Sequence, residues 1–323
     1  MAKKVSVILV NYNGMPHLDS CIPSVLNQTY PSFEIIFVDN NSSDGSLEYA
    51  RQKFPKLVFV ASGKNLGYAG GINAGLAHAT GEYIAPLNID TEVSPNLLAV
   101  MAGFLDENQS TGAVTPKILL FDDRSRINTM GANIHITGLS FCRGLNKLDD
   151  HSTRPQKVSG VSGCSYLIRR EIFDKMGGAP EESFMGNDDV GVSWLVNLMN
   201  YDIYCLPEAV VYHKYTLKMN PEKLFQLEKS RYTLLLYSLK PLTLVLLFPV
   251  LAGTELLTLV YSLLKGRRYI QAKFRVWGAV CENSAYIRDR KALVEKLRKI
   301  SDFQLLKRLR WNLEWGQLLS ISR

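Results

Sequence analysis

Residues 5–11 form the run VSVILVN, and residues 34–39 form the run EIIFVD. Each run is short, apolar and rich in β-branched side chains, and each ends on a polar residue, Asn11 or Asp39. This pattern is typical of strands buried on both faces of a parallel sheet. Two lysines precede the first run, but it is too short for the apolar core of a signal peptide. We therefore expect the chain to begin with a strand of a parallel sheet.

Strands and helices alternate as far as residue 90. The spacing predicts helices at 21–28, 46–54 and 70–80, and strands at 57–60 and 82–87. This alternation favours an α/β fold around a mostly parallel sheet. Such sheets bind ligands beyond the carboxyl ends of their strands, where the sequence places Asn11, Asp39, Asn88 and Asp90. Capping of the helices that follow would also put polar residues there.

Between residues 114 and 168 the pattern is less regular. Gly- and Ser-spaced runs there predict an antiparallel extension of the sheet that shapes a second pocket. Beyond it the pattern predicts helices at 170–176 and 190–200 and strands at 201–206 and 209–213.

The composition is that of a globular protein. Of 323 residues, 46% are apolar and 21% charged, which excludes a disordered, collagen-like or coiled-coil chain. The five cysteines include no C-x-x-C pair, so we expect reduced thiols in a cytosolic setting and neither a disulfide framework nor a zinc finger.

The last third of the chain has a different character. Residues 232–264 are apolar apart from Lys240 and Glu255, and two prolines interrupt them. From residue 265 to the end, 15 basic residues face 5 acidic ones, with leucines at near-helical spacing between 293 and 313. We expect an apolar helical hairpin followed by a basic amphipathic region. Such a region would attach to anionic lipids as a monotopic or re-entrant element rather than as a transmembrane hairpin. A buried helical cap is the alternative.

Taken singly, the polar motifs are ambiguous. Asp39 could accept hydrogen bonds from a nucleoside or begin a helix-capping turn. The glycine-rich residues 64–75 allow a close approach to phosphate, but they match neither a Walker A loop nor a Rossmann fingerprint. Asn88 and Asp90 suit Mg²⁺ or Mn²⁺, or a polar loop.

Two later motifs are equally open. Asp188 and Asp189 at the start of a helix could complement its dipole, or one of them could be a general base. His213 at a strand end could be structural or a ligand.

The order of the motifs is more specific than any one of them. The chain resembles the family-2 inverting glycosyltransferases of the GT-A fold, a Rossmann-like α/β fold, and in particular their rhamnosyltransferase-like branch. The resemblance covers about residues 5–215. It is carried by VSVILVNYN at 5–13, VDNNSSDGS at 38–46, N-x-G at 65–67 and 73–75, LNID at 87–90, the Asp188-Asp189 pair and His213.

The resemblance implies a role for each matched residue. Asp39 would contact the nucleoside of a nucleotide-sugar donor, with Asn11 and Asn65 near the same site. Asp90 would bind Mg²⁺ or Mn²⁺, and His213 would approach the metal or the diphosphate. The other residues that it assigns to the donor site are Gly67, Asn73 and Asn88. Asp189 would align with the catalytic base and Asp188 would lie on the acceptor side.

The implied reaction is a single in-line displacement. The metal would stabilise the leaving diphosphate while Asp189 takes the proton of an acceptor hydroxyl, and the anomeric configuration would invert. Membrane attachment through the C-terminal region would imply a lipid-linked glycan or another membrane-borne hydroxyl as the acceptor, at the cytoplasmic face of the cell membrane and in polysaccharide or cell-envelope biosynthesis. No nucleic-acid partner is expected. No Q-x-x-R-W follows, which argues against a processive synthase.

Two other classes remain open at this stage. A nucleotidyltransferase would use Asp39 and Asp90, but would leave the Asp188-Asp189 pair and His213 unexplained. An inactive membrane-bound scaffold is favoured by Gly191, which stands where the family's longer motif has a third carboxylate. The predicted division is a catalytic domain at 1–220 and a helical, membrane-associated region at 221–323.

Overall fold

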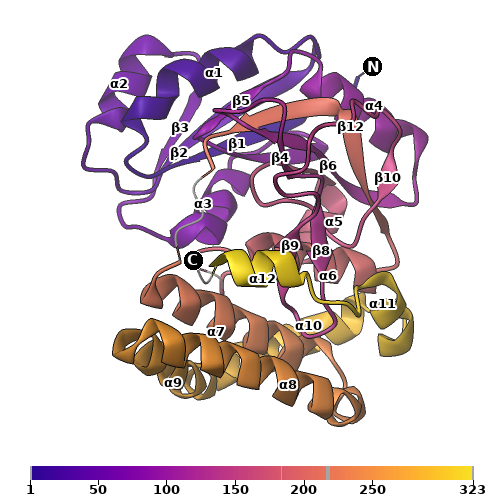
Figure 1. Cartoon of the computed structure of the whole chain (residues 1–323). Coiled ribbons are helices and arrows are strands. Elements are labelled where there is room, and N and C mark those ends of the chain that lie inside the picture. Colours follow the sequence, from indigo (N-terminus) through magenta and orange to yellow (C-terminus); the bar gives the residue numbers. More distant parts are fainter. Residues whose placement is uncertain (1, 183, 216–218, 322–323) are drawn as a thin grey trace.

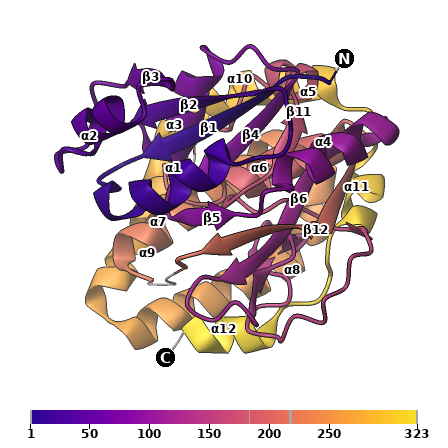
Figure 2. The same cartoon turned by 90° about the horizontal axis from the view of Figure 1, so that it is seen from above.

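The computed structural model describes residues 2–182, 184–215 and 219–321. Figure 1 shows an α/β domain lying on a layer of C-terminal helices. The strands of the main sheet follow the order β10-β12-β6-β11-β4-β1-β2-β3, with β5 and β7 paired at its side. Figure 2 shows these strands fanned across the molecule from β3 to β12.

The parallel part of the sheet confirms the first prediction. Its strands are β1 (Val5–Asn11), β2 (Phe33–Asp39), β3 (Val58–Ala61) and β4 (Tyr83–Asn88). The helices of this half are α1 (Leu18–Leu26), α2 (Ser46–Lys53) and α3 (Gly67–Leu76), after a 3-10 turn at Met15–His17. Asn11 pairs with Asp39 and Val10 with Asn88, so three strands end side by side.

The sheet is buried on both faces, as the apolar runs predicted. Val7 and Leu9 of β1 belong to one core, and Ile8 and Val10 belong to the other. This alternation follows from the two-residue period of a strand.

The less regular part of the sequence forms the rest of the main sheet and a separate two-stranded hairpin. Its strands are β5 (Thr91–Val93), β6 (Thr111–Leu120), β7 (Ile127–Thr129), β8 (Ala132–Ile134), β9 (Ser140–Cys142), β10 (Gln156–Lys157), β11 (Leu167–Arg169) and β12 (Asp202–His213). Its helices are α4 (Leu97–Glu107), α5 (Arg170–Lys175) and α6 (Asp188–Leu198). Strand β11 is antiparallel to β4 and β6, whereas β12 is parallel to β6, and β8 forms a hairpin with β9.

Two strand predictions need correction. The strands expected at 201–206 and 209–213 are one strand, β12, with a register shift between Leu206 and Val210. Residues 158–166 form a loop with isolated bridges rather than a strand. A Cβ on Gly160 would meet Ile134 at 2.6 Å, so this loop packs too closely on β8 for side chains of ordinary size.

The C-terminal region is helical, as expected. It comprises α7 (Pro221–Ser238), α8 (Pro241–Lys265), α9 (Arg267–Glu282), α10 (Ser284–Leu297), α11 (Asp302–Arg308) and α12 (Trp315–Ile321). The leucine-spaced region at 293–313 is not one helix, because Ser301 caps a new helix at α11. Its apolar residues Val294, Leu305 and Leu309 are buried in the core shared with β1. They therefore pack on the α/β domain, so this apolar face is part of the protein core.

A buried ion network joins three of these helices. Arg231 of α7 pairs with Glu228 (Nε–Oε1 2.8 Å), and Lys273 of α9 pairs with Glu228 and with Glu255 of α8 (Nζ–Oε2 2.7 Å). Glu255, one of the two charges within the apolar segment, thus points inward.

Candidate active site

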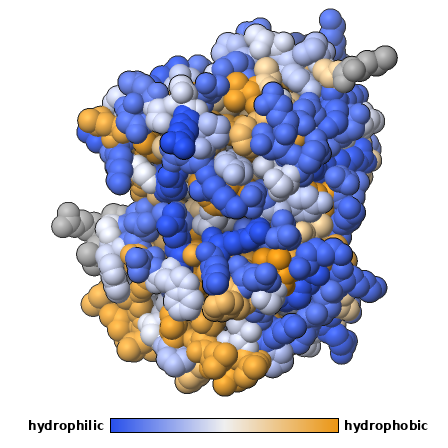
Figure 3. Space-filling view, turned by 90° about the vertical axis from the view of Figure 1, so that its right-hand side faces the viewer, coloured by the Kyte–Doolittle hydropathy of each residue, from blue (hydrophilic) through white to orange (hydrophobic). Residues whose placement is uncertain are grey.

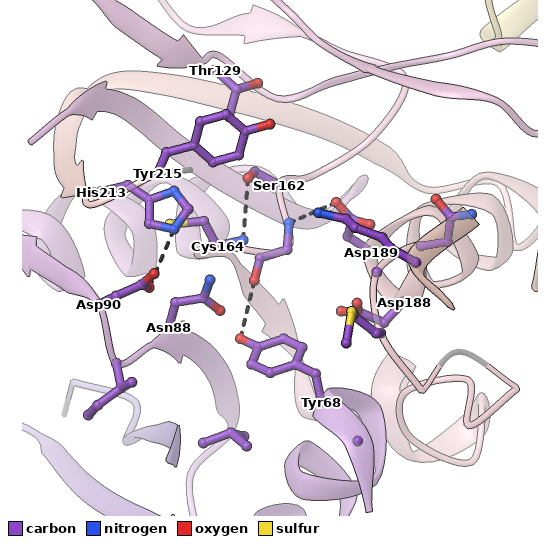
Figure 4. Close-up of a pocket in the computed structure, with 18 of the residues that line it drawn as sticks. Tyr68, Asn88, Asp90, Thr129, Ser162, Cys164, Asp188, Asp189, His213 and Tyr215 are labelled. Atoms are coloured by element: carbon purple, nitrogen blue, oxygen red, sulfur yellow. Dashed lines mark hydrogen bonds and ion pairs between the residues drawn. The ribbon is translucent and has the colours of Figure 1, made fainter. Parts of the chain in front are cut away.

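An open pocket of about 640 Å³ lies beyond the carboxyl ends of β1 and β4. Its other walls come from the β8–β9 hairpin, the 162–164 loop and the start of α6. Figure 4 shows Asp90 and His213 on one side, Asp188 and Asp189 on the other, and Tyr68 between the two sides. The pocket therefore lies where the strand-end rule predicts a ligand site.

Asp90 and His213 meet although 123 positions separate them in the sequence (213 − 90). Asp90 follows β4 and His213 ends β12, which pairs there with β5, so the sheet brings them together. His213 Nε2 lies 3.4 Å from Asp90 Oδ1. Burial opposes a charge on His213, but Cys164 and Asp90 raise its pKa to about 10. Burial also opposes a charge on Asp90, yet the hydrogen bond with His213 holds the pKa of Asp90 below its usual value.

A divalent cation that displaces the proton of His213 Nε2 could be held by this pair. Asn128 Oδ1 lies 3.0 Å from His213 Nδ1, which leaves Nε2 directed at Asp90. Such an outer hydrogen bond is typical of metal-binding histidines. Within the described residues no group of three or more His, Cys, Asp and Glu side chains could hold a metal by itself. Further ligands would have to be donor oxygens or water, as is usual for Mg²⁺.

Asp189 is held by the backbone on the opposite side. The N–H of Gly163 donates to its Oδ2 (2.8 Å), and the N–H of Val190 donates to its Oδ1 (2.9 Å). A Cβ at Gly163 would lie 3.3 Å from Asp189 Cγ, so glycine permits this close approach. Burial raises the pKa of Asp189, and the two N–H groups oppose the rise.

Asp188 lies in a different environment. Its side chain is only 3% exposed, and no hydrogen-bond partner of Oδ2 lies within the described part of the chain. Burial and the charge of Asp189 raise the pKa of Asp188 well above its usual value. Of the two carboxyl groups, Asp188 therefore holds a proton more readily than Asp189.

A contact with α7 fixes the backbone just before these two aspartates. Asn187 adopts a left-handed conformation (φ 63°), which asparagine tolerates better than most residues. Its side-chain amide donates to the carbonyl of Leu227 (3.0 Å). Helix α7 thus helps to position both carboxylates.

The residues predicted for donor binding fall into two groups. Asn65, Gly67 and Asn88 line the pocket, as do Asp90, Asp188, Asp189 and His213. Asn11 and Asp39 lie beneath its wall, where the amide of Asn11 donates to Asp39 (3.0 Å) and to Ser46 (2.8 Å). Asp39 is 4% exposed and also accepts from the Ser42 N–H, so these two residues fix the loop after β2.

Asn73 is not brought to the pocket. Its amide donates to the Ala179 carbonyl (2.9 Å), and its oxygen accepts from the Ala179 N–H (2.8 Å). It therefore holds the segment that leads toward the aspartates.

Other lining residues were missed. They include Asn40, Tyr68, Asn128, Cys142, Cys164, Tyr215 and Lys223. Asn40 stands in the run after β2 that was singled out, and its amide donates to Asn65 Oδ1 (3.1 Å). Tyr68 donates to the carbonyl of Gly163 (3.2 Å), which steadies the loop that orients Asp189. Their residue types carry no signal without the fold.

Comparison with known proteins agrees with this geometry. The family model described as Glycosyl transferase family 2 matches residues 6–177, more than half of the chain, so the protein belongs to this family. It is 27% identical over 210 residues to poly-beta-1,6-N-acetyl-D-glucosamine synthase of Staphylococcus epidermidis, over 64% of this chain. The match spans about half (48%) of that relative's length.

Two further relatives bear on the site and the fold. The chain is 24% identical over 237 residues to the N-acetylglucosaminyl-diphospho-decaprenol L-rhamnosyltransferase of Mycobacterium tuberculosis, covering 66% of this chain and 76% of that one. The mannosyltransferase PcManGT of Pyrobaculum calidifontis, solved with GDP-Man and Mn²⁺, has a TM-score of 0.55 and 17% identity, covering 92% and 85% of the two chains. The GT-A fold is thereby confirmed.

Proposed function

We propose that this protein transfers a sugar from a nucleotide-sugar donor to an acceptor hydroxyl, with inversion at the anomeric carbon. The observation that carries the proposal is the pocket with two opposed sides. The Asp90–His213 pair lies on one side and a backbone-held Asp189 lies on the other. A single in-line displacement needs a leaving group and a base on opposite faces of the sugar, and this pocket offers both positions.

The polar residues at the strand ends would receive the donor. Asn65, Gly67 and Asn88 line the pocket and would contact the nucleotide sugar, together with Asn40. Asp39 and Asn11 would act on the nucleoside by fixing the loop after β2. Asp90 and His213 would hold Mg²⁺ or Mn²⁺, which would neutralise charge on the departing diphosphate. The relative solved with GDP-Man and Mn²⁺ supports both suggestions.

Asp189 would act as a general base and would form no covalent bond to the sugar. Each carboxylate oxygen of Asp189 has one lone pair left after its backbone hydrogen bond, so the side chain can still accept the acceptor's proton. Asp188 beside it would line the acceptor side.

We further propose that the acceptor is lipid-linked and that α8 binds the membrane surface. Leu242, Leu246 and Leu264 of this helix are at least 70% exposed. Of the described helices, α8 is the one long and apolar enough to cross a membrane. Lys240 and Arg267 flank it, which suits an anionic leaflet. Figure 3 shows apolar residues gathered at the end of the molecule that the C-terminal helices form. The rhamnosyltransferase relative, named for a decaprenol-linked acceptor, supports this proposal.

A panel of nucleotide sugars incubated with Mn²⁺ tests the proposal. Slow release of a nucleoside diphosphate from one donor is expected, and mass spectrometry of lipid extracts would then identify the product. Release of pyrophosphate would instead indicate a nucleotidyltransferase. No turnover across the panel would indicate an inactive binding protein.

A further inference from the structure

A second hollow lies outside the active site, between α8 and the segment that leads into α12. It is a groove of about 750 Å³, within the range of about 300–1,000 Å³ typical of ligand pockets. On one side it is lined by Val250, Gly253, Leu256, Leu257 and Val260 of α8. On the other it is lined by Trp311, Leu313 and Trp315. We call it the α8–α12 groove.

The chemistry of the α8–α12 groove favours a hydrocarbon chain. None of its described lining side chains carries a formal charge. Both ring nitrogens of His135 are engaged, with Thr137 Oγ1 (2.7 Å) and the Trp311 carbonyl (3.1 Å). Thr254 donates to a carbonyl of its own helix. A peptide in this groove would leave its backbone N–H and C=O groups largely unpaired, whereas a hydrocarbon has none to pair.

One hairpin, β8–β9, connects the groove with the active site. Ser140 and Cys142 of β9 line the active-site pocket, and His135 at the far end of the same hairpin lines the groove. Helix α12 makes a second link. Its Gln317 accepts from the N–H of Cys142 (3.0 Å) and donates to the Cys142 carbonyl (2.7 Å). Trp315, two residues earlier on α12, lines the groove.

We propose that the α8–α12 groove binds the hydrocarbon tail of the acceptor lipid. This inference rests on the proposed transfer to a lipid-linked hydroxyl. An acceptor whose hydroxyl lies at Asp189 would pass Cys142 and place its tail between α8 and the two tryptophans. The groove opens on the apolar face of α8, since Leu256 and Val260 line it and are 61% and 44% exposed. A tail can thus enter from a bilayer without crossing water.

A glycine provides a variant that fills the groove. A Cβ on Gly253 would meet nothing within 4 Å, so Gly253→Phe should occupy the groove without disturbing the packing of α8. Gly278 on α9 is equally open, and Gly278→Phe is the matched control. Neither change costs helix propensity, because glycine is already unfavourable inside a helix.

The binding probe is bromododecyl phosphate, used below its micelle concentration, with tryptophan fluorescence quenching as the readout. Gly253→Phe should weaken binding about tenfold, the effect of excluding roughly two methylene groups, and Gly278→Phe should not. Quenching should persist in Trp277→Phe and disappear in the Trp311→Phe/Trp315→Phe double variant. Unchanged binding by Gly253→Phe would overturn the proposal. So would a wild-type dimer that Gly253→Phe converts to a monomer, since the groove would then hold a second copy.

Donor turnover separates this inference from the proposed function. Nucleotide-sugar hydrolysis does not need the groove, so it should be the same in wild type and Gly253→Phe. If hydrolysis occurs but the probe does not quench, the tail site is wrong and the transfer activity stands. If the probe quenches in the groove but no donor is turned over, the groove binds lipid and the proposed function fails.

Discussion

Replacing Asp189 by Asn tests the proposed base most directly. Asp189 accepts one backbone N–H on each carboxylate oxygen, from Gly163 and Val190. An amide nitrogen cannot accept, so the variant loses one of these bonds and turns its own N–H toward a backbone donor. The unpaired donor should cost about 1–3 kcal/mol of stability. Loss of the base should lower the transfer rate by about 100- to 10,000-fold.

Asp188→Asn is the matched comparison, because it removes an adjacent carboxyl whose burial favours the protonated form. Burial raises the pKa of Asp188 well above its usual value, so an amide resembles the protonated acid that it replaces. We expect Asp188→Asn to lose much less activity than Asp189→Asn. Initial rates at saturating donor, corrected for the folded fraction from thermal unfolding, give the comparison. Near-normal transfer by Asp189→Asn, or an equal loss in both variants, would refute the assignment of the base.

Three other variants test different parts of the molecule. Asp90→Ala should abolish metal-dependent donor binding in calorimetric titrations, and wild-type activity that survives excess chelator would remove the metal from the proposal. The double variant Leu242→Gln/Leu246→Gln on the exposed face of α8 should sediment less with anionic liposomes than wild type, whereas equal sedimentation would exclude this face. Burial opposes the negative charge of Glu228, but Arg231 and Lys273 lower its pKa to about 2. The ionised side chain of Glu228 stabilises the fold fully above its ordinary pKa of 4.5, and this stabilisation is lost as the pH falls toward 2. Calorimetry should therefore show the unfolding temperature dropping over that interval, and dropping less in Glu228→Gln.

The parallel half of the sheet could be predicted because its signal is local. An apolar β-branched run that ends on a polar residue contains both the strand and its carboxyl end, as β1 shows with Asn11. The same signal does not say where the polar side chain points. Asn11 and Asp39 were predicted to contact the donor, yet they bond each other under the wall. Only the register of β1 with β2, which sets them side by side, decides this.

The remaining walls depend on contacts that no local pattern encodes. Cys142 lies in the pocket at the end of the β8–β9 hairpin. Its carbonyl accepts a hydrogen bond from Gln317, which is 175 positions later in the chain. The leucine spacing at 293–313 predicted an apolar face correctly, but the same face can cover a protein core or a membrane. The turn capped by Ser301 lets that face fold back onto the α/β domain.

The apolar sequence of α8 likewise fits two arrangements, a helix that spans a membrane and a helix that lies on its surface. The buried charges around Glu255 favour the second. At about 1.5 Å per residue its 25 residues could span the roughly 30 Å of a bilayer core. Its Glu255, however, pairs with Lys273 of α9 on the side opposite the exposed leucines. To cross the bilayer, α8 would have to take Glu255 away from Lys273 or carry α9 and its arginines into the hydrocarbon, and an uncompensated buried charge costs about 3–5 kcal/mol. Under the proposal that α8 binds the membrane, we therefore expect it to lie along the surface, with the α8–α12 groove toward the lipid.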